Sequence, residues 1–150
     1  MKRRDFIKKS TFISSAYALP KSSNRNDFDL SNSEPVVVST WDHGLLANRV
    51  SWDILAAGGK SLDAVEEGVR VVESDPNIRT VGMGGYPDRE GIVTLDACIM
   101  DYESNCGSVA FLRDIVNPIS VARKVMEETP HVMLVGQGAK NFALKKGFKE

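Results

Sequence analysis

The chain has 150 residues, room for one ordinary domain, and its 42% hydrophobic and 26% charged residues are typical of globular proteins. The formal net charge of −1 gives no electrostatic basis for binding nucleic acid or an anionic membrane. No apolar run reaches the ~20 residues that a membrane-spanning helix requires.

The first 34 residues indicate an export signal followed by a disordered spacer. Residues 2–9, Lys-Arg-Arg-Asp-Phe-Ile-Lys-Lys, resemble the twin-arginine export signal, and residues 16–18, Ala-Tyr-Ala, have the form of a signal-peptidase site. A Sec-type signal and a disordered basic arm are the alternatives. Residues 21–34 are rich in Ser, Asn and Asp, which predicts a spacer. We expect a folded domain over 35–150 and a periplasmic or secreted protein.

Three elements are predicted before the first glycine-rich loop. The β-branched residues 36–40 predict a short buried strand. Apolar residues at helical spacing over 46–57 predict a helix that ends at a pair of glycines. Ser61 is a plausible N-cap for a second helix, which an Asp-Pro pair closes at residues 75–76.

A loop and a hairpin follow. Four glycines and a proline in residues 80–91 exclude regular structure and allow close approach of the backbone. Residues 92–100 predict a strand with apolar residues on both faces, which indicates burial between two layers. A turn over 101–105 leads into a returning strand over 107–112, so these residues predict an antiparallel hairpin.

The last third is predicted to be mostly helical. Asn117 can cap a helix, and Pro118 suits its first position because proline lacks the N–H that would be free there. Pro130 ends this helix, residues 132–135 are extended, and a final helix runs over 138–147. The order of elements is not a strict β-α alternation, so it predicts an antiparallel sheet covered by helices.

Three motifs carry a family resemblance over residues 35–150. They are Leu-Asp-Ala-Cys-Ile-Met-Asp at 95–101, Gly-Ser-Val-Ala at 107–110, and the run from Asn117 to Gly136 that begins Asn-Pro-Ile-Ser-Val-Ala-Arg. Together they resemble the glycosylasparaginase branch of the threonine-type asparaginases. The resemblance implies an α/β (α+β) fold, the four-layer αββα sandwich of the N-terminal nucleophile hydrolases, of which 35–150 is the N-terminal, α-subunit part.

The resemblance also implies a reaction. In that family the precursor cuts its own chain, and the α-amine of the freed threonine is the base for its hydroxyl, which attacks the side-chain amide of N4-(β-N-acetylglucosaminyl)-L-asparagine. Neither His-Asp-Thr nor Asn-Gly-Thr, the family's cleavage sequences, occurs in residues 1–150, so we assign no catalytic residue here. The nucleophile and the substrate clamp are expected after residue 150. The implied partner is a β-subunit from the same precursor in an (αβ)2 heterotetramer without a cofactor, and residues 1–150 alone are expected to be inactive.

Two residues match pocket positions of the family. Trp41 corresponds to a tryptophan that lines the substrate site, and an exposed indole is a good platform for a sugar-linked asparagine. The alternative is that Trp41 fills the core. His43 stands where relatives commonly have an aromatic residue. It could be a polar group of the pocket, but we expect it to be a solvated loop residue. Thr80 corresponds to a small hydroxyl residue near the nucleophile, and the alternative is a loop threonine that bonds to the backbone.

Other motifs have simpler explanations. The glycines of residues 82–85 lack the spacing of a phosphate-binding loop, and the Gly-Gln-Gly at 136–138 is equally weak evidence for a nucleotide. Asp96 and Asp101 could form a carboxylate pair, but Asp101 is more simply a turn residue.

The two cysteines decide little about redox chemistry. Cys98 lies in an apolar strand and is expected to be buried, while Cys106 lies across the hairpin. A disulfide is conceivable, but two free thiols are favoured. With His43 and His131 distant in sequence, the chain offers no ready zinc site.

Two other functions stay open. Plant-type L-asparaginases and isoaspartyl peptidases share the later motifs, but they typically have His-Gly-Gly-Ala-Gly where residues 39–44 here are Ser-Thr-Trp-Asp-His-Gly. The second alternative is a non-catalytic binding or scaffold protein on the same half-fold. The sequence after residue 150 would separate these functions, since a self-cleavage threonine would indicate an enzyme.

Overall fold

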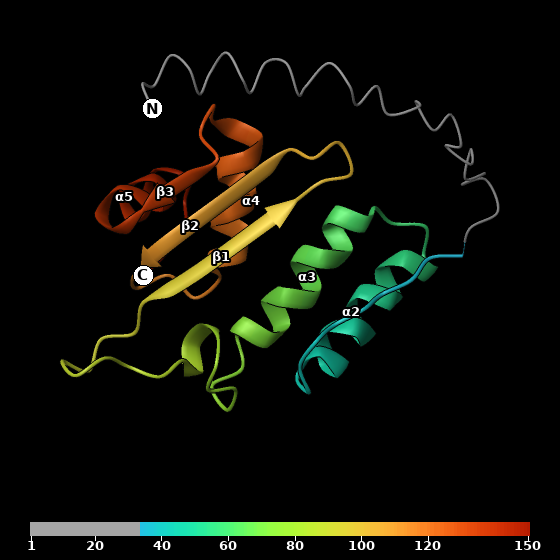
Figure 1. Ribbon diagram of the computed structural model, residues 1–150, viewed down its shortest axis with the longest axis horizontal. Coiled ribbons are helices and arrows are strands. Elements are labelled where there is room, and N and C mark those ends of the chain that lie inside the picture. Colours follow the sequence, from blue (N-terminus) through green and yellow to red (C-terminus); the bar gives the residue numbers. More distant parts are fainter. Residues whose placement is uncertain (1–33) are drawn as a thin grey trace, which may run out of the picture. The chain divides into compact units, whose positions relative to one another are not determined.

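The computed structural model describes residues 34–150. The predicted export signal and most of the spacer, residues 1–33, lie outside the described residues. Residues Pro35–Glu150 form one compact unit (Figure 1). No helix of the described part is both long and apolar enough to cross a membrane.

The first two helices pack side by side, and both confirm the sequence prediction. Helix α2 spans Gly44–Ala56 and helix α3 spans Ser61–Glu73. They approach closely because Gly68 faces Ser51, and a Cβ on Gly68 would lie 2.2 Å from the Ser51 hydroxyl oxygen. That hydroxyl donates a hydrogen bond of 2.7 Å to the carbonyl of Ala64. The predicted capping role of Ser61 is wrong, because Lys60 occupies the N-cap and no side chain bonds there.

A three-stranded sheet follows. Strands β1 (Leu95–Met100), β2 (Cys106–Leu112) and β3 (Met133–Val135) lie in the order β1-β2-β3. The predicted hairpin is confirmed, since β1 and β2 are antiparallel. The third strand is parallel to β2, because the chain returns through a helix between them, so the sheet is mixed rather than antiparallel.

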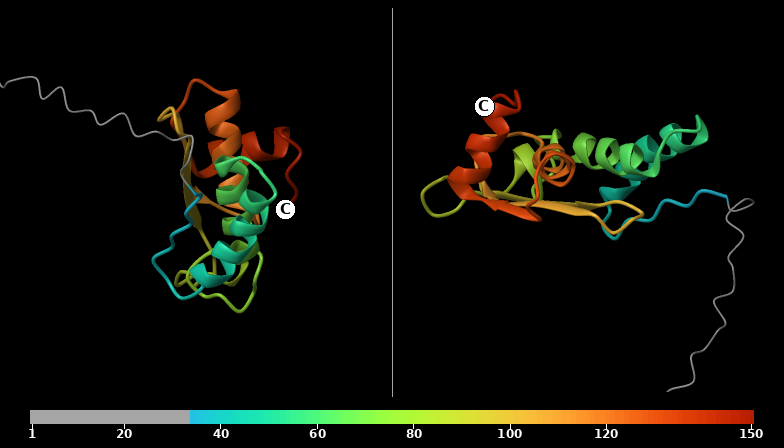
Figure 2. Two further views of the ribbon diagram at one scale, coloured as in Figure 1. Left: turned by 90° about the vertical axis from the view of Figure 1, so that its right-hand side faces the viewer. Right: turned by 90° about the horizontal axis from the view of Figure 1, so that it is seen from above.

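Helices α4 (Pro118–Glu128) and α5 (Gly136–Lys145) complete the fold. Both helices were predicted, although α5 begins two residues earlier than expected. The helices lie on one side of the sheet (Figure 2). Helix α4 lies close against β2, because Gly107 has no side chain there; a Cβ would lie 2.2 Å from the Ala122 carbonyl oxygen. The core between this helix layer and the sheet consists mainly of Ile99, Val109, Leu112, Ile115, Ile119, Val121, Ala122, Val125, Ala139 and Ala143.

The opposite face of the sheet is largely exposed among the described residues, although Ser108 on the central strand is buried. Cys98 lies on this face with an exposed side chain, so the expected burial of Cys98 is wrong. Met100 is 63% exposed, and Met133 and Val135 are also exposed. The apolar pattern on both faces of the hairpin is therefore real, but only one face is covered.

The predicted strand at residues 36–40 is not formed. These residues are irregular, and Val36 and Val38 are 78% and 81% exposed. Preference for β-structure expresses itself only when a neighbouring strand supplies hydrogen-bond partners and a surface to pack on. None of the three described strands pairs with this segment.

Candidate functional site

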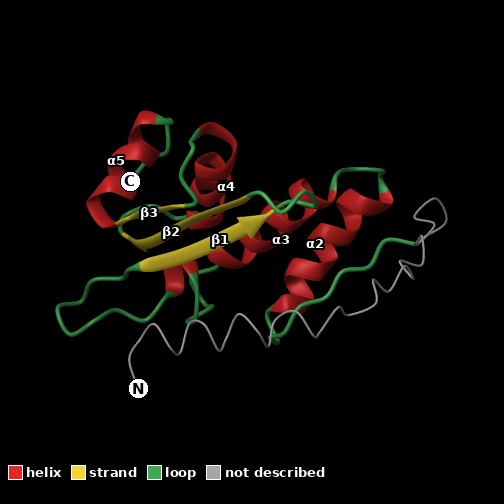
Figure 3. Ribbon diagram, turned by 45° about the horizontal axis from the view of Figure 1, so that its top comes forward, coloured by secondary structure: helices red, strands yellow, loops and turns green. Residues whose placement is uncertain are grey.

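The glycine-rich loop between α3 and β1 forms one wall of the site. It is irregular (Figure 3), apart from the short 3-10 helix η2 at Gly82–Gly84. Gly82 has φ of +61°, and a Cβ there would lie 2.0 Å from the carbonyl oxygen of Glu73. A Cβ on Gly84 would lie 2.2 Å from the carbonyl oxygen of Ile78. Glycine is required at both positions by this close approach of backbone to backbone.

The segment before α2 forms a second wall. Trp41 lies just outside the helix, and its carbonyl accepts a hydrogen bond of 3.0 Å from Gly44 N. The indole is 62% exposed, which does not fit a core filler. The imidazole of His43 stacks on it, with ring centroids 5.9 Å apart and an angle of 25° between the rings. His43 is therefore not the solvated loop residue that we expected, since its side chain is only 20% exposed.

These two walls enclose a cleft that contains both predicted site residues. Its volume of about 560 Å³ lies within the range of small-molecule sites. Trp41 and Thr80 are 39 positions apart in the sequence (80 − 41), and the fold brings both to this cleft. The lining residues are Trp41, His43, Arg79, Thr80, Val81, Gly85, Tyr86, Thr94 and Leu95.

Arg79 and Tyr86 also line the cleft, although neither was predicted from the sequence. Both belong to the glycine-rich loop, and a hydrogen bond of 3.1 Å from Tyr86 N to the Arg79 carbonyl closes that loop at the cleft. The signal was present in the composition of the loop, since an aromatic and a cationic side chain on a glycine-rich turn are candidates for binding. An exposed indole, an exposed phenol, a guanidinium and two threonine hydroxyls can together hold a ligand with apolar faces and polar edges.

Comparison with protein families identifies the family of the chain that forms this cleft. Residues 37–150 match the family model described as asparaginase. The chain belongs to the asparaginase family.

Relatives of this asparaginase-family chain carry related names. A protein from Elizabethkingia miricola named N(4)-(Beta-N-acetylglucosaminyl)-L-asparaginase is 58% identical over 152 residues, covering 99% of this chain and 45% of that protein. A protein of the same name from Rattus norvegicus is 48% identical over 119 residues, covering 79% of this chain and 34% of that protein. An isoaspartyl peptidase/L-asparaginase from Rattus norvegicus is 42% identical over 100 residues, covering 66% of this chain and 30% of that protein. The chain thus spans less than half the length of these relatives.

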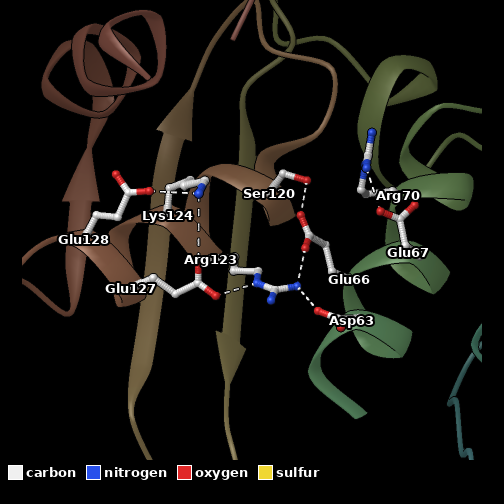
Figure 4. A network of polar contacts seen from close by, with 9 residues as sticks. All are labelled: Asp63, Glu66, Glu67, Arg70, Ser120, Arg123, Lys124, Glu127 and Glu128. Carbon is white, nitrogen blue, oxygen red and sulfur yellow. Dashed lines mark hydrogen bonds and ion pairs between the residues drawn. The ribbon is translucent and has the colours of Figure 1, made fainter. Parts of the chain in front are cut away.

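The motif that opens helix α4 is used in contacts between α3 and α4. Arg123 lies within 2.7 Å of carboxylate oxygens of Asp63 and Glu66 on α3 and of Glu127 on its own helix (Figure 4). Ser120 donates its hydroxyl hydrogen to Glu66 at 2.5 Å. Burial alone would lower the pKa of Arg123, but the hydrogen bonds that its guanidinium donates to three carboxylates raise it. This part of the family motif therefore fixes one helix against another and does not line the cleft.

Asn117 also acts in a way that the sequence did not predict. It occupies the N-cap of α4, but its side chain makes no capping bond there. Instead the amide donates to the Arg70 carbonyl at 3.3 Å and to the Ser74 hydroxyl at 3.0 Å, at the end of α3. The free N–H of Ile119 is satisfied by Glu73, whose carboxylate oxygen lies 3.1 Å away.

Glu73 is the one carboxyl group among the described residues whose pKa is raised to about 8. Burial of the side chain is the main cause, and the hydrogen bonds from Ile119 N and Asn117 and the charge of Arg70 oppose it. Glu73 and Thr80 line a second cavity of about 330 Å³, which shares Thr80 and Thr94 with the cleft. Thr80 therefore lies between the cleft and this buried carboxyl group.

The remaining candidates have structural roles. Asp101 accepts hydrogen bonds from the backbone N–H groups of Glu103 and Asn105, both at 2.9 Å, which confirms it as a turn residue. The hydrogen bond from the Asn105 amide lowers the pKa of Asp101. Asp96 accepts a 2.7 Å hydrogen bond from Phe111 N across the hairpin. Both cysteines are free thiols, and residues 34–150 contain no group of three potential metal ligands.

Proposed function

We propose that this chain is the N-terminal, α-subunit part of an amidohydrolase that cleaves N4-(β-N-acetylglucosaminyl)-L-asparagine to aspartate and a glycosylamine. The observation that carries the proposal is the cleft, in which an exposed indole and a threonine hydroxyl meet on a chain of the asparaginase family. The names of the Elizabethkingia and rat relatives favour the glycosylated substrate.

In the proposed mechanism the nucleophile comes from outside residues 1–150. An autoproteolytic cut frees a threonine, and its α-amine takes the proton of its own hydroxyl as the hydroxyl oxygen attacks the side-chain amide. The amide C–N bond then breaks, the protonated α-amine gives its proton to the leaving glycosylamine, and water hydrolyses the remaining ester to aspartate and the free threonine. Thr80 lies at the cleft with its hydroxyl available to orient that amine. Trp41 offers an aromatic face to the sugar, so the residues of this chain bind and position while the second subunit reacts.

The exposed apolar sheet face supports the remainder of the proposed fold. Methionine and valine side chains on that face would be buried by a second sheet packed about 10 Å away, as in the αββα sandwich. We propose that this second sheet includes the β-subunit and that two αβ pairs form the (αβ)2 heterotetramer. Residues 34–150 leave this face uncovered, so we expect the chain of residues 1–150 alone to be poorly soluble and inactive.

The proposed place of action is the periplasm or the extracellular space. It rests on the paired arginines and the small-x-small site in residues 1–34, which lie almost entirely outside the described residues. Cell fractionation of the full-length protein, with both arginines replaced by lysine in a control, tests this separately from the activity.

The experiment that tests the function uses the full-length precursor. After expression, mass spectrometry determines whether the chain is cut and whether the new subunit begins with threonine. Release of aspartate is then compared for glycosylated asparagine, for asparagine and for a β-aspartyl dipeptide. We expect a cut chain that prefers the glycosylated substrate. Preference for the dipeptide would favour the isoaspartyl peptidase, and an uncut chain that turns over nothing would favour the scaffold.

A further inference from the structure

Helices α3 and α4 exchange side-chain hydrogen bonds with each other's backbone at the point where they meet. The first turn of a helix has unpaired N–H groups, and a carbonyl in its last turn can accept a second hydrogen bond. Here Asn117, at the start of α4, donates to the Arg70 carbonyl at the end of α3, which also accepts from Ser74 N at 3.0 Å. Glu73, the last residue of α3, accepts from Ile119 N in the first turn of α4. We call this pair of contacts the reciprocal cap.

The reciprocal cap lies directly beneath the glycine-rich loop. A Cβ on Gly82 would lie 2.0 Å from the carbonyl oxygen of Glu73 and 2.3 Å from its Cα, so the loop rests on the backbone of Glu73. The loop is closed above this point by a 3.0 Å hydrogen bond from Gly85 N to the Gly82 carbonyl. Thr80 is two residues before Gly82. A displacement of the end of α3 would therefore move Thr80 as well.

A carboxyl group at position 73 costs free energy of desolvation that an apolar side chain would not. Glu73 is only 3% exposed, and a buried carboxylate must be desolvated. On α3, the positive charge of Arg70 lowers the pKa of Glu73 and the negative charge of Glu66 raises it. Asp96 of β1 lines the same cavity as Glu73. From α4 it meets the Asn117 amide and the Ile119 N–H. An apolar side chain would remove the cost but would leave Ile119 N unpaired, which disfavours the contact between the helices.

We propose that Glu73 is a positioning residue for the cleft: through the reciprocal cap and Gly82 it sets the place of the Thr80 hydroxyl. The inference deepens the proposed function and rests on it for its effect on catalysis. The inference gives Glu73 and Arg123 different roles. Arg123 also joins α3 to α4, but it contacts the N-terminal half of α3, away from the loop. The two residues therefore make a matched pair for an experiment.

The test compares three variants of the full-length enzyme. Glu73→Gln keeps the size of the side chain and an oxygen that accepts from Ile119 N. Glu73→Leu keeps the approximate size but removes that acceptor. Arg123→Met removes the ion pairs from α4 to Asp63 and Glu66 of α3 and leaves the hydrogen bond between Ser120 and Glu66 in place. Steady-state kinetics on the glycosylated asparagine are measured at a temperature where thermal unfolding shows all three variants to be folded, and amide hydrogen exchange is followed over residues 82–86.

We expect Glu73→Leu to lower kcat by about tenfold or more with KM nearly unchanged, because a misplaced Thr80 impairs orientation more than binding. Glu73→Gln should restore kcat, and Arg123→Met should leave it near the wild-type value. Exchange over 82–86 should be faster in Glu73→Leu alone. Equal losses of kcat in Glu73→Leu and Arg123→Met, or equal exchange in the two, would overturn the inference. If the wild-type protein turns over no substrate, the proposed function fails, and hydrogen exchange alone then decides whether Glu73 holds the loop.

Discussion

Replacing Gly107 by alanine tests how closely helix α4 packs on strand β2. The added Cβ would lie 2.2 Å from the Ala122 carbonyl oxygen, 2.5 Å from Met126 N and 2.6 Å from Met126 Cβ. Ordinary contacts begin at 3.4 Å, so the helix must move away by about 1.2 Å (3.4 − 2.2) at the closest atom. Two of the three atoms belong to the helix backbone, which cannot rotate aside as a side chain can.

The expected loss is at the upper end of the range for overpacked cores, about 3 kcal/mol in the free energy of unfolding. It is measured by urea unfolding of the full-length protein, followed by circular dichroism. The control is Gly138→Ala in helix α5, where no atom lies within 4 Å of the added Cβ. Alanine favours a helix over glycine by about 0.8–1.0 kcal/mol, so the control should be slightly stabilising. A stability of Gly107→Ala within about 0.5 kcal/mol of the wild type would refute the close packing that we describe.

Three further predictions follow from the structure. The pKa of Glu73 is raised from 4.5 to about 8, so its stabilising contribution is complete below pH 4.5 and is lost as the pH rises through about 8. The difference of 3.5 (8 − 4.5), at about 1.36 kcal/mol per pH unit, limits the whole loss to about 5 kcal/mol. Between pH 6 and pH 9 the remaining two pH units (8 − 6) correspond to about 3 kcal/mol, which urea unfolding at these two pH values should show in the wild type but not in Glu73→Gln. Arg123→Met should cost about 2 kcal/mol in unfolding free energy, because it leaves the partly buried Glu66 without its cation, and an unchanged denaturation midpoint would contradict this. Trp41→Ala in the full-length protein should raise KM for glycosylated asparagine by about tenfold, which corresponds to about 1.4 kcal/mol, and should raise KM for asparagine less. If the substitution changes KM equally for the two substrates, Trp41 has only a structural role.

The helices and the hairpin could be predicted from the sequence because their signals are local. Apolar spacing marked α2 and α3, and proline at residue 118 marked the start of α4. Family motifs placed Trp41 and Thr80 near a common pocket, and the fold brings both to one cleft. Their part in binding stays a prediction.

Other features depended on partners that are distant along the chain. The strand predicted at residues 36–40 did not form, because a strand needs an edge to pair with and no described strand offers one to this segment. His43 stacks on an indole, although its loop sequence indicated a solvated side chain. In both cases the local sequence indicated only what the segment itself favours. The structure that formed depended on the residues that the fold placed beside it.

The amino-acid sequence by itself determined the family of this chain, most of its helices and the two residues that we place in the cleft. Tertiary structure alone decided that Asn117 of the family motif donates to the end of α3, and that Glu73 accepts from a backbone N–H 46 positions further along. The physical reason is that periodicity and propensity report which side of an element is buried. They do not report which distant group will satisfy a helix end, since that depends on how the elements meet in space.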